Sequence, residues 1–190
     1  MLTTIILVAV AVLLRFSAPT FGTWNLVPMG AIALYAGAKL PRRWAWLVPV
    51  AGMVLSDVVL DHGHGRSFTE LWRWVGYVAL GATALFGPLA RVQELGVLRY
   101  PLLSLGASTL FFLASNGAVW VEDHGQYYAP TTAGLIACYV AGLPFYGRTI
   151  VADLAGTAVF FGLGPVIERA ARRVGLIHLK EPAADSDFLS

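Results

Sequence analysis

The sequence has little charge and almost no cysteine. Only 13% of its 190 residues are charged, whereas 57% are hydrophobic, and the mean hydropathy is +0.69. Soluble domains carry about 25% charged residues, and a chain of this size has too little interior to hide so much apolar surface. The composition therefore argues against a soluble enzyme, a disordered chain and a nucleic-acid-binding protein. The single cysteine, Cys138, excludes an internal disulfide and a multi-thiolate metal site, and a net charge of +2 indicates no polyanionic partner.

Long apolar runs recur along the chain, and a helix needs about 20 such residues to cross a bilayer. We expect an all-α polytopic membrane protein that forms one domain over residues 1–180, followed by a polar tail over 181–190. The first run is also compatible with a signal peptide, although it lacks a basic leading region. Between the last two spans, residues 132–143 predict a short helix that Pro144 ends. The six predicted spans are residues 1–16, 25–40, 44–60, 68–90, 100–121 and 149–167.

The basic residues give this chain an orientation. With the N-terminus inside and six spans, nine of the 13 lysines and arginines lie in cytoplasmic segments and four lie outside. This distribution fits the positive-inside rule. Both termini are then predicted to be cytoplasmic.

Small residues recur four positions apart within the predicted spans. Ala33 and Gly37 form one such pair, and Ala152 and Gly156 form another. Small residues at this spacing allow membrane helices to approach closely. We interpret both pairs as packing positions.

The polar and aromatic side chains gather at the predicted outer ends of the spans. Asp57 and Asp153 lie within apolar segments, where ionisable residues are costly and face a partner or a cavity. Each aspartate is compatible either with a tie between helices or with a ligand site. Asn116 is likewise open to an interhelical or a ligand contact, whereas Ser115 is expected to bond its own backbone. The candidate ligand-binding residues are Asn25, Asp57, His62, Asn116, Trp120, Tyr146, Arg148 and Asp153.

Histidines near the outer ends raise the alternative of a metal site. His62 and His64 lie in a glycine-rich loop, and His124 follows the fifth predicted span. Together with Asp61, these residues offer imidazole and carboxylate ligands, and three such groups that converge would suit zinc, nickel or cobalt. A solvated turn is the competing interpretation of the same pattern.

Common enzyme signatures are absent from the sequence. It contains no Gly-x-Ser-x-Gly, no His-Glu-x-x-His and no phosphate-binding Gly-Lys-Ser/Thr motif. We therefore predict that the chain is not an enzyme. Transport driven by ATP would need a separate motor subunit.

Several runs of the sequence resemble a family of small bacterial integral membrane proteins of unknown function. These runs are residues 25–38, 48–57, 115–120, 139–145 and 149–154, and the resemblance extends from about residue 25 to residue 161. That family in turn resembles the substrate-binding S-components of energy-coupling-factor vitamin transporters. The second resemblance implies six helices, cytoplasmic termini, an outward-opening pocket and location in the bacterial inner membrane. It also implies partnership with a transmembrane coupling subunit and its ATPases.

Three functional hypotheses follow from these features. The leading one is a subunit that binds a small solute for uptake, such as a vitamin, a related cofactor or a transition-metal complex. The second is an accessory subunit of a larger membrane complex that binds no ligand. The third is an intramembrane enzyme that uses Asp57 and Asp153 as paired carboxylates.

Overall fold

The computed structural model describes residues 26–62, 69–92, 94 and 96–173, together with residues 9, 12, 13, 15 and 16 of the N-terminal segment. The regular elements of this part of the chain are all helices and it contains no strand, as the sequence predicts. The helices are α2 (Met29–Lys39), α3 (Arg42–Ala45), α4 (Leu47–His62), α5 (Leu71–Leu85), η1 (Gly87–Arg91), η2 (Gly96–Leu98), α6 (Arg99–Glu122) and α7 (Thr132–Arg173).

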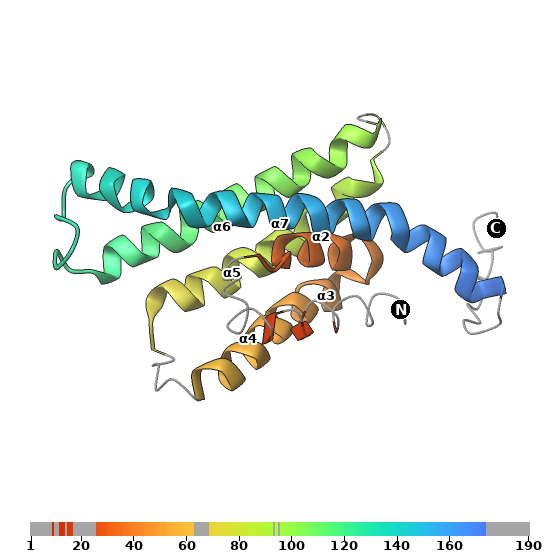
Figure 1. Cartoon of the computed structure of the whole chain (residues 1–190), viewed down its shortest axis with the longest axis horizontal. Coiled ribbons are helices and arrows are strands. Elements are labelled where there is room, and N and C mark those ends of the chain that lie inside the picture. The colour runs from red at the N-terminus through yellow and green to blue at the C-terminus, as the bar shows by residue number, and fades with distance from the viewer. Residues whose placement is uncertain are drawn as a thin grey trace, which may run out of the picture.

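The long helices run along the longest axis of the molecule (Figure 1). The helices α6 and α7 form an antiparallel pair, joined by the turn at the left of the view, and α7 runs nearly the whole length of the molecule. The helices α4 and α5 cover a second side of the bundle. The shorter helix α2 lies between these two groups and contacts α4, α5, α6 and α7.

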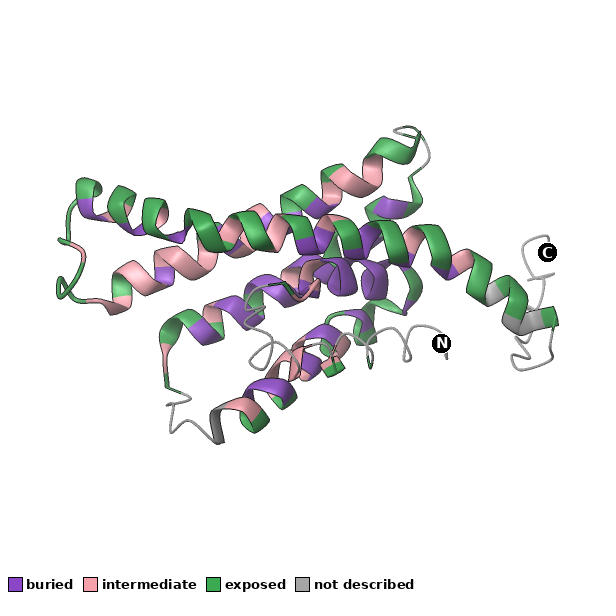
Figure 2. Ribbon diagram, viewed as in Figure 1, coloured by how far each residue is buried: buried purple, intermediate pink, exposed green. Residues whose placement is uncertain are grey.

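Helix α2 forms the centre of the hydrophobic core. Nine of its 11 residues are buried, and they occupy every face of the helix rather than one stripe (Figure 2). Its sequence, MGAIALYAGAK, is rich in alanine and glycine. Small side chains allow neighbouring helices to approach an enclosed helix from all directions.

The predicted small-residue positions lie at these close approaches. A Cβ at Gly37 would clash with the backbone of Ala84 and Gly87, and one at Gly156 would clash with Pro28. The two glycines therefore set how closely α2 packs against the end of α5 and against α7. The structure confirms the interpretation of Gly37 and Gly156 as packing residues.

The expectation of a separate short helix over residues 132–143 is wrong. Pro144 lies inside α7, which is continuous over 42 residues and also contains Pro165. Proline removes one intrahelical hydrogen bond, but the turns on either side keep theirs. In a membrane, moreover, ending the helix at Pro144 would leave several backbone N–H and C=O groups unpaired, whereas proline within a continuous helix leaves about one.

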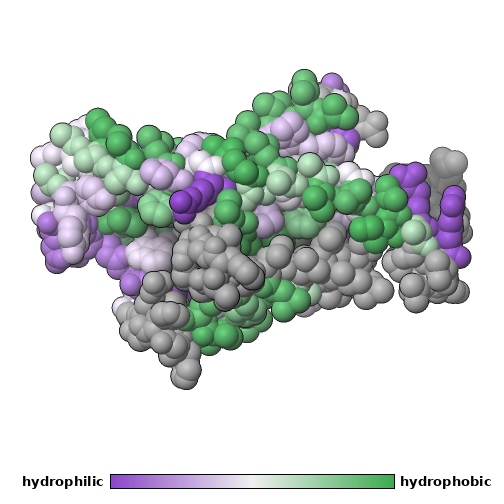
Figure 3. Space-filling model, in the orientation of Figure 1, coloured by the Kyte–Doolittle hydropathy of each residue, from purple (hydrophilic) through white to green (hydrophobic). Residues whose placement is uncertain are grey.

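Three helices in the described residues are long and apolar enough to cross a membrane. They cover Arg42–Leu60, Gly96–Glu122 and Thr132–Ile167. On the face in Figure 3, apolar residues lie mainly along the upper middle, and hydrophilic residues gather at both ends. The chain therefore has the features of a membrane protein.

The number of spans stays a prediction. At 1.5 Å per residue, the 11 residues of α2 cover about 17 Å and the 15 residues of α5 cover about 23 Å, against a hydrocarbon core of about 30 Å. Neither helix crosses the core by its own length. The first predicted span lies mostly outside the described residues.

Candidate functional site

A cavity of about 510 Å³ lies between the helices and brings together several of the predicted site residues. Its walls come from α2, α4, α5, α6 and α7, with Arg15 from the N-terminal segment. Pockets for small ligands have volumes of about 300–1,000 Å³ and mainly apolar and aromatic walls with a few polar groups. Four of the eight predicted ligand-binding residues line this cavity, namely Asp57, Asn116, Tyr146 and Asp153.

One side of the cavity contains a cluster of charged and polar residues around Asp57. The Asp57 carboxylate forms ion pairs with Arg15 and with Arg73, whose Nη1 lies 3.5 Å from Oδ2. The Tyr77 hydroxyl donates a hydrogen bond of 2.7 Å to the same Oδ2. We call these four residues the Asp57 cluster. It connects the N-terminal segment, α4 and α5, because each contributes at least one member.

The charges at the Asp57 cluster are balanced within the protein. Besides its ion pair with Asp57, Arg73 donates a 3.1 Å hydrogen bond from Nη2 to Glu70 one turn earlier in the chain. Two arginines therefore face two carboxylates. Burying an ion is costly unless a counter-ion and hydrogen bonds compensate, and here both are present for Asp57. The cluster is thus suited to holding three segments together at the cavity wall.

The second predicted aspartate, Asp153, also connects helices. Its Oδ2 accepts a 2.8 Å hydrogen bond from the Ser108 hydroxyl of α6, and its Oδ1 accepts one of 3.2 Å from the backbone N–H of Ala31. Ala31 lies in the first turn of α2, where backbone N–H groups have no intrahelical partner. Asp153 of α7 therefore caps α2 from outside that helix. Gly30 makes this approach possible, since a Cβ there would clash with the carboxylate.

Aromatic residues of α6 and α7 form the opposite wall of the cavity. The rings of Phe112 and Tyr146 stack with centroids 4.4 Å apart and an angle of 20° between planes. The Tyr146 hydroxyl lies 2.7 Å from Oγ1 of Thr109 and shares a hydrogen bond with it. A flat aromatic surface held in this way can stack against a planar ligand.

The two polar residues Ser115 and Asn116 lie on the same wall. The Ser115 hydroxyl donates to the backbone carbonyl of Phe111 at 2.7 Å, which confirms that it bonds its own helix. The Asn116 side-chain nitrogen donates to the carbonyl of Phe112 at 3.0 Å, and its oxygen faces Gly142 of α7. Asn116 therefore combines an interhelical position with a position at the cavity.

Two of the predicted ligand-binding residues lie away from the cavity. The Trp120 indole donates a 3.1 Å hydrogen bond to the carbonyl of Ala129, so it holds the turn between α6 and α7. Arg148 is exposed on α7 and does not line the cavity. Asn25 and the side chain of His62 lie outside the described residues.

Of the three histidines predicted for a metal site, only His124 has a described side chain. It lies in the turn after α6 with a positive φ of 49°. Within the described ranges, no group of three histidine, cysteine, aspartate or glutamate residues is placed to hold a metal ion. His64 lies outside those ranges, so the metal site stays a prediction.

Sequence reasoning missed the partners of the two aspartates. Arg73 and Tyr77 lie one helical turn apart in an apolar helix, and Ser108 lies in another. Arg73 carried a usable signal, because a basic residue inside an apolar helix requires a counter-ion, and Asp57 is an acidic residue in the preceding helix. Ser108 carried no such signal.

Comparison with known proteins places the chain in a family. Its residues 1–174 match a family of unknown function, DUF6580, and the chain belongs to that family. Neither the curated proteins nor the solved structures contain a match to it. The resemblance to S-components therefore stays a prediction.

Proposed function

We propose that this member of the DUF6580 family is a membrane-embedded subunit that binds a small solute for uptake, in the manner of an S-component. The solute is of the size of a vitamin, a related cofactor or a metal complex. The observation that supports this proposal is the cavity of about 510 Å³, lined by aromatic side chains and a few fixed polar groups.

The chemistry of the walls favours a solute with a planar or aromatic part. Phe111, Phe112, Phe145 and Tyr146 provide rings on one side, and Trp72 and Tyr77 provide rings on the other. Aromatic rings add stacking energy to the burial of apolar area. Polar atoms of the wall that lack a hydrogen-bond partner among the described residues, such as Nε of Arg15, would then orient the ligand.

The proposed transport mechanism combines this cavity with six spans in the bacterial inner membrane. The solute would enter from outside, near the turn between α6 and α7. A coupling subunit with ATPases would then reorient the bundle and release the solute inside. The proposal agrees with the excess of basic residues in the segments that we assign to the cytoplasm.

The contacts of the two aspartates argue against the alternative of paired catalytic carboxylates. Asp57 is held by two arginines and a tyrosine, and Asp153 by a serine and a backbone N–H. Each carboxylate thus has separate structural partners. Acid–base catalysis by such a pair would require at least one group to be available to the substrate.

A pair of glycine substitutions tests solute binding. Gly76 lines the cavity, and a Cβ there meets only the Phe111 ring at 3.4 Å, an ordinary contact. Gly76→Leu should therefore fill part of the cavity while leaving the hydrogen bonds of its walls in place. The matched control is Gly106→Leu in α6, where a Cβ meets no atom within 4 Å.

The purified full-length protein and both variants are titrated with a panel of vitamins and transition-metal salts by calorimetry. We expect the wild type and Gly106→Leu to bind one panel member with equal affinity, and Gly76→Leu to lose at least about tenfold, or ~1.4 kcal/mol. Binding by none of the panel, or equal binding by a folded Gly76→Leu, would contradict the proposal. In the first case, purification with a fixed partner that lacks an ATPase would favour an accessory subunit.

A further inference from the structure

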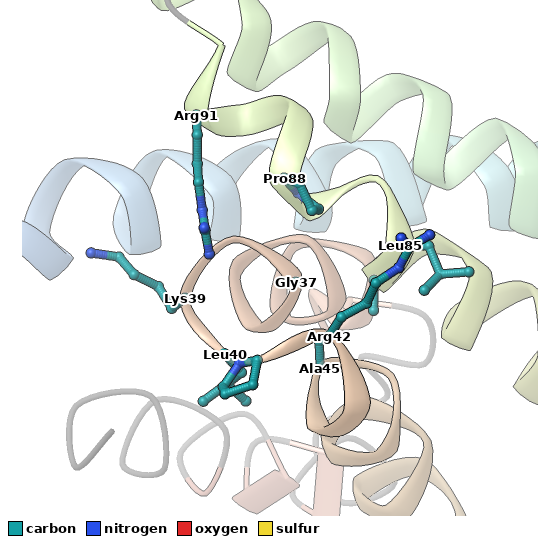
Figure 4. A pocket seen from close by; sticks show the side chains of 10 residues that line it. Gly37, Lys39, Leu40, Arg42, Ala45, Leu85, Pro88 and Arg91 are labelled. Atoms are coloured by element: carbon teal, nitrogen blue, oxygen red, sulfur yellow. The ribbon is translucent and has the colours of Figure 1, made fainter. Parts of the chain in front are cut away.

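A second pocket, of about 350 Å³, is shown in Figure 4. The elements that form it lie away from the turn between α6 and α7 (Figure 1). It forms where the end of α2, the link to α3, the end of α5 and η1 meet. Its lining residues are Gly37, Lys39, Leu40, Pro41, Arg42, Ala45, Ala84, Leu85, Pro88 and Arg91.

The charge of this pocket has one sign. Lys39, Arg42 and Arg91 line it, each from a different element, and no acidic side chain does. Neither Arg42 nor Arg91 forms an ion pair with any described residue. The positive charge of these two arginines, which no acidic residue in the described part of the chain pairs, attracts an anionic ligand.

The arginine Arg91 is held in place at this pocket. Its Nε donates a 2.7 Å hydrogen bond to the carbonyl of Ala38, near the end of α2. This contact fixes the guanidinium beside the pocket and leaves its two Nη groups for a ligand. A planar guanidinium matches phosphate oxygens with two parallel hydrogen bonds.

Exposed apolar side chains lie beside the basic pocket. Leu85 lines it with 46% of its surface exposed, and Phe86 and Leu89 follow in the chain at 44% and 48%. Arg42 is also the first residue of a helix apolar enough to cross a membrane. The pocket therefore combines positive charge with an apolar surface at the level where a membrane helix begins.

We propose that this pocket binds the phosphate headgroup of an anionic phospholipid, with the acyl chains against Leu85, Phe86 and Leu89. A free phosphate compound would use the arginines alone, whereas a phospholipid would use both features. Basic pockets between membrane helices bind anionic headgroups in this way. The proposal does not depend on which solute the larger cavity binds.

Charge-neutralising substitutions test the lipid site. Arg42→Gln removes a side chain that has no polar partner in the described part of the chain, so the fold should tolerate it. Arg91→Gln removes the second cation but also the bond to Ala38. The control is Arg43→Gln, which removes the same charge from the neighbouring residue. The Arg43 side chain lies over the Trp44 ring and does not line the pocket.

Native mass spectrometry of the purified full chain measures retention of phosphatidylglycerol against phosphatidylcholine. We expect the wild type and Arg43→Gln to prefer phosphatidylglycerol, and Arg42→Gln and Arg91→Gln each to lose about fivefold of that preference. Equal losses in all three variants, or no preference in the wild type, would overturn the proposal. Full displacement of the lipid by an equal concentration of glycerol phosphate would also overturn it, in favour of a free phosphate ligand.

Discussion

At the scale of single residues, Asp153 shows how one buried carboxylate organises several helices. It lies in α7, accepts from Ser108 of α6 and caps the first turn of α2 through Ala31. Only 1% of its surface is exposed. A buried acceptor of this kind stabilises the fold mainly because its removal leaves the Ala31 N–H without a partner, whereas the Ser108 hydroxyl can still donate to the Ser104 carbonyl at 3.0 Å.

We predict that Asp153→Ala lowers the free energy of unfolding by about 1–3 kcal/mol, whereas Asp153→Asn lowers it less. Asparagine keeps an oxygen for the Ala31 N–H, and its amide can still bond the Ser108 hydroxyl. Thermal unfolding of the purified variants in one detergent measures the difference. If Ser108→Ala added its full effect to that of Asp153→Ala, the two residues would not be coupled, contrary to their 2.8 Å contact.

The sequence located both buried aspartates but not what they contact. An ionisable residue in an apolar run can be recognised from the sequence alone, and the free-energy cost of burying it implies a partner. The partner itself depends on which helices are neighbours. Ser108 is 45 residues from Asp153 and Ala31 is 122 residues away, so no local pattern could identify either. For the same reason, the sequence could not distinguish Trp120, which donates a hydrogen bond to the turn, from Tyr146, which lines the cavity.

At the scale of helices, the continuity of α7 is the main departure from the sequence prediction. Proline is a reliable helix breaker in water, where a free carbonyl can bond to solvent. Within α7, Pro144 is preceded by 12 helical residues and followed by 29. The cost of one missing hydrogen bond is smaller than that of ending a helix and starting another in an apolar environment.

Spin labels on α7 test this continuity. Ile136 and Val159 are exposed and lie on either side of Pro144, 23 residues apart. In a continuous helix their backbones are about 35 Å apart at 1.5 Å per residue. Cysteines at these positions, in a Cys138→Ala background, should give a single pulsed-EPR distance near that value after allowance for the labels.

The same measurement with Phe145 and Leu163 labels serves as a reference, since both positions follow Pro144 and their backbones are about 27 Å apart in a continuous helix. A main distance well below about 35 Å for the longer pair would show that the helix folds back at Pro144. The prediction of a short helix over residues 132–143, separate from the span over 149–167, would then be correct.

At the scale of the whole molecule, three of the described helices are long and apolar enough to cross a membrane, whereas α2 and α5 are too short to do so by their own length. The helix class and the apolar character followed from composition and run length alone. The enclosed position of α2 did not, because its hydrophobicity resembles that of the helices around it. Only the small size of its side chains distinguishes a helix that is surrounded by protein from one that faces lipid.

Cysteine accessibility tests the proposed orientation. In a Cys138→Ala background, a cysteine at Gln126, in the turn between α6 and α7, should react with a membrane-impermeant maleimide in intact cells. A cysteine at Arg43 should react only after the membrane is opened. Labelling of Arg43→Cys first, or of both positions in intact cells, would be incompatible with six spans and cytoplasmic termini.

The central position of α2 has a consequence for biosynthesis. This helix leaves the ribosome early, but its capping residue Asp153 is made 122 residues after Ala31. At 11 residues, it is also too short to settle across a bilayer on its own. Its final position therefore depends on helices that are translated later, and the core can close only after the part of α7 that contains Asp153 has been made. A chain that stops before α7 would lack Asp153, so that α2 and α6 would have no residue to connect them through Ala31 and Ser108.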